Sequence, residues 1–160
     1  MNKKKYAIAG TGHRALTMYV MPLENDFSDA AEVVGLYDIN QMRAEFVKKE
    51  SGTKAKVYSD FDEMLRVEKP DVLIVTMVDR FHHEYTIKGL EFGCDIISEK
   101  PMTINADGCN AIMEAEKRTG KKVNVTFNCR FMPFAKRVKE LLDGGIVGEI
   151  LNVDFEWLLD

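Results

Sequence analysis

The stretch KYAIAGTGHRA, residues 5–15, decides the fold of this chain. A short apolar run leads into a Gly-x-Gly-x-x-Ala turn, and a helical pattern follows at once. Gly10 permits the sharp turn, Gly12 lets the backbone approach phosphates, and the small Ala15 lets helix and strand pack closely. The amides at the start of the helix then face the anion. The pattern predicts a dinucleotide site; a glycine turn that only avoids steric strain is the alternative.

An acidic residue, Asp38, follows the next apolar strand, residues 32–37. A carboxylate in this place accepts hydrogen bonds from the ribose hydroxyls of adenosine and repels a 2′-phosphate, which favours NAD over NADP. Arg43 is near enough in sequence to pair with a 2′-phosphate, so NADP stays possible. The alternative is that Asp38 is a solvated acid that caps the helix beginning at Ile39.

Length and composition are those of one ordinary globular domain: 160 residues, 46% apolar and 30% charged. The net charge of −4 offers no field that would attract nucleic acid or an anionic membrane. The first residues do not form a secretory signal, and no apolar stretch reaches the roughly 18 residues of a membrane span. Cys94, Cys109 and Cys129 lack metal-type spacing, so we expect a cytoplasmic, reducing location and no metal site.

Strand-like and helix-like segments alternate along most of the chain. Short continuous apolar runs at residues 72–75, 95–97 and 123–125 are typical of parallel strands that are buried on both faces. Apolar residues at helical spacing predict the helices between them and one after them. These residues are Ile39, Met42 and Phe46; Phe61, Met64 and Leu65; Ile87 and Leu90; Cys109, Ile112 and Met113; and Phe134, Val138, Leu141 and Leu142. The order predicts an α/β fold, a doubly wound parallel Rossmann sheet over about residues 4–127.

Residues 148–157 break this rhythm, because apolar and polar residues alternate there. A period of two belongs to a strand with one solvated face, as in an antiparallel sheet. Such a strand needs partners. We therefore predict a nucleotide-binding domain at residues 1–147 and, at 148–160, the start of a second domain that is mostly absent. The strand at 150–157 is expected to be disordered or paired with a neighbouring copy, because an uncovered edge invites association.

Polar side chains follow the strand at residues 95–97. Ligands bind beyond the carboxyl ends of the strands in open α/β sheets, so Glu99, Lys100 and Pro101 should face that cleft. Pro101 stiffens the turn. A lysine held there is able to donate or accept a proton at neutral pH; a plain surface lysine is the alternative.

Two further segments lie at strand ends. Asp79 to Glu84 follow the strand at 72–75, and His82 is placed to meet a nicotinamide ribose or a substrate, or simply to begin a helix. Arg130 follows the strand at 123–125, where it would hold an anionic or polyhydroxylated ligand or form a salt bridge.

Taken together, these motifs resemble the Gfo/Idh/MocA family of NAD(P)-dependent oxidoreductases, which includes glucose–fructose oxidoreductase and inositol dehydrogenases. The resemblance covers essentially the whole chain, which is similar to the N-terminal nucleotide-binding half of that family. The motifs that carry it, in the family's order and spacing, are Gly10-Thr11-Gly12-x-Arg14, Asp79-x-x-His82-x-Glu84, Glu99-Lys100-Pro101 and Arg130-Phe131-x-Pro133.

The resemblance implies hydride transfer between C4 of nicotinamide and a carbon of a sugar, cyclitol or related alcohol. Lys100 is implied as the catalytic residue, which hydrogen-bonds the reacting oxygen and helps to transfer its proton while Glu99 and Pro101 position it. A cis Lys100–Pro101 bond is also favoured. The residues predicted to bind the cofactor are Gly10, Thr11, Gly12, His13, Arg14, Asp38, Asp79, His82, Glu99, Pro101 and Arg130.

Two departures from the family matter. Met77 stands where the family often has proline. The family's catalytic acid and histidine, most of its substrate contacts and its usual dimer interface belong to a C-terminal α/β domain. We therefore expect a homo-oligomer through that domain and no activity from these 160 residues alone. The alternatives are a non-catalytic NAD(H)-binding regulatory module and a methyltransferase, in which Glu99-Lys100-Pro101 would have no role.

Overall fold

A computed structural model describes residues 3–156 and 158 of the chain. The chain divides into two compact units, residues 1–126 and 127–160. The domain division predicted between residues 147 and 148 stays a prediction.

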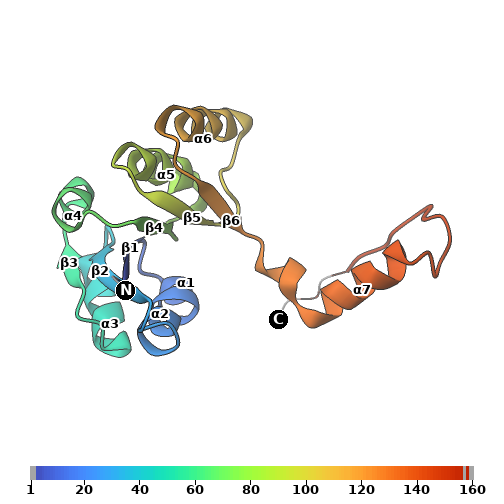
Figure 1. The fold of residues 1–160 in the computed structure, drawn as a ribbon, viewed down its shortest axis with the longest axis horizontal. Coiled ribbons are helices and arrows are strands. Elements are labelled where there is room, and N and C mark those ends of the chain that lie inside the picture. Colours follow the sequence, from blue (N-terminus) through green and yellow to red (C-terminus); the bar gives the residue numbers. More distant parts are fainter. Residues whose placement is uncertain (1–2, 157, 159–160) are drawn as a thin grey trace. The chain divides into compact units, whose positions relative to one another are not determined.

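The first unit is built on one six-stranded sheet (Figure 1). The strands run in the order β3-β2-β1-β4-β5-β6, and every neighbouring pair is parallel. Their bounds are β1 Lys4–Ala9, β2 Ala31–Tyr37, β3 Lys56–Tyr58, β4 Val72–Val75, β5 Asp95–Glu99 and β6 Val123–Thr126. The doubly wound parallel sheet predicted from the sequence is confirmed. The order reverses direction beside β1, which creates a crevice at the carboxyl ends of β1 and β4.

Helices cover both faces of this sheet (Figure 1). Their bounds are α1 His13–Ala15, α2 Met21–Asn25, α3 Gln41–Ser51, α4 Phe61–Glu68, α5 His82–Glu91 and α6 Ala106–Thr119. Helices α1–α3 lie on one face and α4–α6 on the other. Alternate residues of each central strand enter the two cores: Ile74 packs with the α1–α3 side, and Leu73 and Val75 with the α4–α6 side. This two-sided burial explains why the central strands are continuously apolar.

The first helix is longer than the sequence pattern suggests. A π-helical turn, Leu16–Val20, joins α1 to α2 without a break, so that the helical segment continues to Asn25. The amide of Met21 donates to the carbonyl of Leu16, five residues earlier. Pro22 comes next and has no N–H to donate. A missing donor inside a helix widens or kinks the turn that precedes it, which accounts for the π-turn here.

Helix α3 is present as predicted, but its apolar spacing does not identify its buried face. Ile39, Met42 and Phe46 have helical spacing, yet they are exposed by 67%, 78% and 57%. The sheet is instead contacted by the smaller Ala44 and Val47, which are buried. Strand β3 is a second miss, because three residues are too few to show a period.

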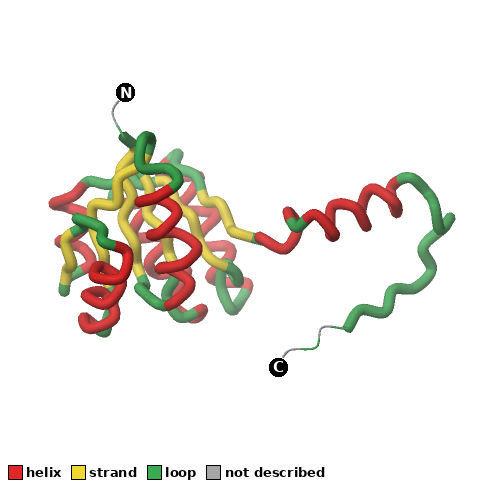
Figure 2. The backbone as a smooth tube through the Cα atoms, turned by 90° about the horizontal axis from the view of Figure 1, so that it is seen from below, coloured by secondary structure: helices red, strands yellow, loops and turns green. Residues whose placement is uncertain are grey.

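The second unit contains a short 3-10 turn, Asn128–Phe131, and helix α7, Pro133–Asp143. The sequence predicts this helix correctly, but its apolar stripe is largely uncovered within the unit, with Phe134, Val138 and Leu142 exposed. A loop follows α7 in Figure 2. Residues 150–156 form no strand in this single chain, where the described part of the unit offers no strand to pair with; pairing with a neighbouring copy stays a prediction, and Trp157 lies outside the described residues.

Candidate functional site

The glycine turn lies against the end of β4. Gly10 has a φ of +93°, and a Cβ atom there would come within 2.6 Å of the carbonyl of Thr76. Thr76 also binds the turn, since its amide donates to Ala9 O at 2.8 Å and its hydroxyl donates to Gly10 O at 2.5 Å. Only glycine therefore fits at position 10.

Gly12 presents the opposite case. A Cβ atom on Gly12 would meet no heavy atom within 4 Å, so the space before it is open. Gly12 is also the N-cap of α1, and no side chain caps that helix. Uncapped amides that face open space at a helix start suit a phosphate group. The turn is therefore a candidate site for a pyrophosphate group.

Asp38 follows β2 directly and is only 7% exposed. Its Oδ2 accepts the amide of Thr11 at 2.7 Å and the Thr11 hydroxyl at 3.0 Å. Its Oδ1 accepts the amide of Asn40 at 2.8 Å. Helix α3 is capped by the Asn40 side chain, which accepts the Met42 amide, so Asp38 is not the helix cap. An ionised carboxylate has about four acceptor sites, which leaves Oδ1 able to accept a ribose hydroxyl.

A cavity of about 540 Å³ opens beside this turn. It is lined by Thr11, Gly12, His13, Leu16, Met42, Arg43, Phe46 and Val47. Met42 and Phe46, whose spacing predicts helix α3, therefore line a candidate ligand cavity. Arg43 is exposed beside them, as the possible pairing with a 2′-phosphate requires.

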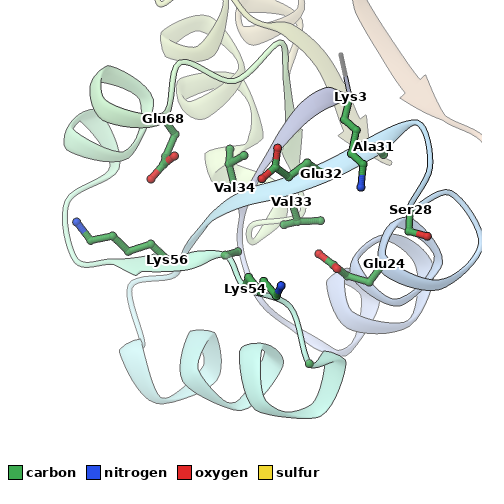
Figure 3. A pocket seen from close by; sticks show the side chains of 12 residues that line it. Lys3, Glu24, Ser28, Ala31, Glu32, Val33, Val34, Lys54, Lys56 and Glu68 are labelled. Atoms are coloured by element: carbon green, nitrogen blue, oxygen red, sulfur yellow. The ribbon is translucent and has the colours of Figure 1, made fainter. Parts of the chain in front are cut away.

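Another cavity, of about 600 Å³, lies at the amino ends of β2 and β3 (Figure 3). Its charged lining residues carry both signs: Lys3, Glu24, Glu32, Lys54, Lys56 and Glu68. Open α/β sheets bind ligands at the carboxyl ends of their strands, and a mixed lining selects no charged ligand. The cavity beside the glycine turn is therefore the better candidate for the functional site, although it is slightly smaller.

Glu99, the last residue of β5, is 5% exposed and joins several segments. Its Oε1 accepts Arg14 Nε at 2.8 Å and the Tyr19 hydroxyl at 2.6 Å. Its Oε2 accepts the amide of Lys100 at 3.2 Å. Burial opposes ionisation, but the hydrogen bonds from Tyr19 and Arg14 outweigh it and lower the pKa of the Glu99 carboxyl. Tyr19 is a site residue that the sequence analysis missed.

Lys100 is exposed, and the Lys100–Pro101 bond is cis, as the resemblance favours. The carbonyl of Pro101 lies 2.7 Å from Nδ1 of His82, and the carbonyl of Met77 lies 2.8 Å from Nε2 of the same ring. His82 is 1% exposed. Both of its ring nitrogens face backbone oxygens, so in this structure His82 holds two loops together and has no ring nitrogen left for a ligand.

The remaining predicted residues are exposed. His13 and Asp79 lie on the surface of the first unit, at the start of α1 and in the turn before α5. Arg130 belongs to the second unit, where its guanidinium lies 5.4 Å from the centre of the Phe127 ring. Among the described residues, no three metal-ligating side chains gather to hold an ion.

Known proteins similar to this chain share its fold and much of its sequence. A family model, GFO_IDH_MocA, described as an oxidoreductase family with an NAD-binding Rossmann fold, matches residues 4–127. The putative oxidoreductase YteT of Bacillus subtilis strain 168 is 38% identical over 161 residues, which are 98% of this chain and 38% of that protein. Inositol 2-dehydrogenase of Klebsiella pneumoniae strain 342 is 32% identical over 119 residues, 74% of this chain and 35% of that protein.

A solved structure agrees with these relatives. The myo-inositol dehydrogenase of Lactobacillus casei, in complex with NAD(H) and myo-inositol, superimposes with a TM-score of 0.81 at 30% identity. The match covers 92% of this chain and 43% of that chain. The present chain therefore spans less than half the length of the relatives it matches.

Proposed function

Because the chain belongs to the Gfo/Idh/MocA oxidoreductase family, we propose that it is the nucleotide-binding part of an enzyme that transfers hydride between NAD(P) and a sugar, cyclitol or related alcohol. The observation that carries this proposal is the glycine turn, with its open helix start at Gly12 and its bond from Thr11 to the buried Asp38. The nicotinamide supplies the hydride chemistry when it is bound. The chain supplies binding, orientation and proton handling.

The proposed cofactor contacts are supported by the open helix start and by the partners of Asp38. The amides from Thr11 to Arg14 hold the pyrophosphate, and Asp38 Oδ1 accepts a ribose hydroxyl. The buried carboxylate of Asp38 would repel a 2′-phosphate, which supports NAD as the preferred cofactor. Arg43, which lines the cavity, could pair with a 2′-phosphate, so NADP is the alternative. We also propose Asp79 and Arg130 as cofactor contacts. His82 and Pro101 act on the site through the backbone.

Lys100 is the proposed catalytic residue. It hydrogen-bonds the reacting oxygen of the alcohol and moves its proton, and Glu99 fixes the main chain of the turn that carries it. A polyol substrate class is supported by the names of the relatives, an inositol 2-dehydrogenase and a myo-inositol dehydrogenase structure. A non-catalytic NAD(H) sensor would need neither Lys100 nor the bonds that fix Glu99. We also propose that the whole protein is a homo-oligomer. The three free cysteines support a reducing, cytoplasmic location.

Titration with NADH and NADPH, followed by nicotinamide fluorescence, tests this function. We expect NADH to bind more tightly than NADPH. Equal affinities would show that Asp38 does not read the ribose, and no binding of either would overturn the proposed function.

Turnover is a separate question. We expect the 160-residue chain to form no NADH from a polyol, because Lys100 is exposed and water exclusion is part of hydride transfer. Robust NADH production from myo-inositol would contradict this expectation while supporting the enzyme class.

A further inference from the structure

Tyr19 occupies an unusual place in the first helix. It lies in the π-helical turn Leu16–Val20, and its hydroxyl lies 2.6 Å from Glu99 Oε1. The same hydroxyl lies 3.1 Å from Thr126 Oγ1, at the end of β6. Tyr19 therefore reaches from the helix behind the glycine turn to the ends of two strands. Within a helix, π-turns occur frequently at functional sites, where the extra residue in the turn re-aims a side chain.

The Glu99 carboxylate is the point at which these segments meet. Two donors on Oε1, Arg14 and Tyr19, come from the helix that follows the pyrophosphate turn. The donor on Oε2 is the main-chain amide of Lys100. One buried charge thus ties the cofactor turn to the turn that carries the lysine. Removing a donor from a buried charge costs more than removing one from a neutral acceptor.

We propose that Tyr19 is a positioning residue, which acts through Glu99 to hold the main chain of Lys100 in place against the helix of the pyrophosphate turn. This inference rests on the proposed function for the importance of Lys100. Its physical content, the coupling of Tyr19 to Glu99 and Lys100, is measurable without catalysis.

The chain offers a matched control. Tyr58, at the end of β3, donates its hydroxyl to Glu68. Burial raises the pKa of both Tyr19 and Tyr58 to about 12, with a further rise from the neighbouring glutamate in each case. Glu68 lies on α4 and lines the cavity at the amino ends of the strands rather than the site. Tyr58→Phe therefore removes the same kind of bond elsewhere in the same unit.

The test follows the backbone amide signal of Lys100 by NMR in the 160-residue chain and its Tyr19→Phe and Tyr58→Phe variants. In the unmodified chain this signal reports the ionisation of Glu99 as pH falls. In Tyr19→Phe we expect the titration midpoint to rise by about one pH unit and the amide to exchange with solvent about tenfold faster, because the charged form has lost a donor. Tyr58→Phe should leave both values unchanged.

NADH binding separates positioning from cofactor binding. Tyr19→Phe should bind NADH within about twofold of the unmodified chain, because the turn and Asp38 are untouched. If the midpoint reported by the Lys100 amide signal and the exchange rate of that amide are the same in Tyr19→Phe as in Tyr58→Phe, or if Tyr19→Phe abolishes NADH binding, the positioning role is wrong. If the unmodified chain binds no NADH, the proposed function fails, while the Lys100 amide still decides the role of Tyr19.

Discussion

The two oxygens of Asp38 have different partners, and this division bears on cofactor choice. Oδ2 is used by the amide and hydroxyl of Thr11, and Oδ1 accepts only the amide of Asn40 among the hydrogen bonds found for the described residues. The two hydrogen bonds from Thr11 to Oδ2 shape the glycine turn before any ligand binds. The second oxygen has acceptor capacity left for a ribose hydroxyl. A substitution at Asp38 therefore alters shape and recognition together.

These two effects are separable with Asp38→Ala and Thr11→Val. Asp38→Ala should lower NADH affinity by about tenfold or more and NADPH affinity by less, because a hydrogen bond to a charged group is lost only for the ribose with a free 2′-hydroxyl. Thr11→Val removes the 3.0 Å hydroxyl contact alone and should weaken both cofactors equally. Fluorescence titration gives the ratio of the two affinities. An equal change of that ratio in both variants would show that Asp38 only shapes the turn.

Gly10 and Gly12 are glycines for different reasons. Gly10→Ala places a methyl group 2.6 Å from the Thr76 carbonyl at a φ of +93°, so we expect a loss of about 2 kcal/mol or more in the free energy of unfolding. Gly12→Ala meets no protein atom, and its stability should change by less than about 1 kcal/mol. Its NADH affinity should nevertheless fall, because the methyl group fills the phosphate approach. Urea denaturation and NADH titration check both; normal NADH binding by Gly12→Ala would contradict the placement of the pyrophosphate.

At the scale of the elements, the sequence predicts those whose two faces are both buried. Val72 and Ile74 face one core while Leu73 and Val75 face the other, so the continuous apolar run of β4 indicates a strand that is buried on both faces. A helical spacing is less informative, because it says which residues share a face and not what covers that face. Met42 and Phe46 share a face of α3 that borders the cavity.

Contacts between distant elements are the part that the sequence pattern misses. The positions of Asp38 and Glu99 at strand ends follow from the parallel sheet, because carboxyl ends of parallel strands meet at one edge. The bond between Tyr19 and Glu99 depends on a π-turn and on side chains 80 residues apart, which no local period encodes. His82 likewise fits a helix start in the sequence, and only the fold brings it to Met77 and Pro101.

His82 gives a prediction at this scale. His82→Leu removes the ring whose nitrogens lie 2.7 Å from the Pro101 carbonyl and 2.8 Å from the Met77 carbonyl, so we expect a loss of about 2–4 kcal/mol in the free energy of unfolding. The matched control is His83→Leu on the same helix turn, whose Nδ1 is buried with no partner among the described residues, and it should cost less than about 1 kcal/mol. Urea denaturation measures both. Equal losses would mean that the ring of His82 contributes only by filling space.

At the scale of the first unit, segments far apart in sequence form one site because strand order reverses beside β1. Residues 10–14 follow β1, Asp38 follows β2, and Lys100 follows β5. Buried ionisable groups near these junctions make the stability of the whole unit depend on pH at both extremes. The two limits have separate chemical sources and can be assigned by substitution.

On the acid side the expected sources include Glu99. The pKa of the Glu99 carboxyl in the folded chain is lowered from the ordinary 4.5, so its contribution to the free energy of unfolding is present above that value and is lost as pH falls through the lower, folded value.

On the alkaline side the source includes Tyr19, whose pKa rises from 10.0 to about 12, so its contribution to the free energy of unfolding is present below pH 10 and is lost as pH rises towards 12. Urea denaturation across this range should show Glu99→Gln with a flatter acid limb and Tyr19→Phe with a flatter alkaline limb. An acid limb unchanged in Glu99→Gln would mean that other carboxylates carry the acid sensitivity and that the bonds from Arg14 and Tyr19 do not favour the charged form of Glu99.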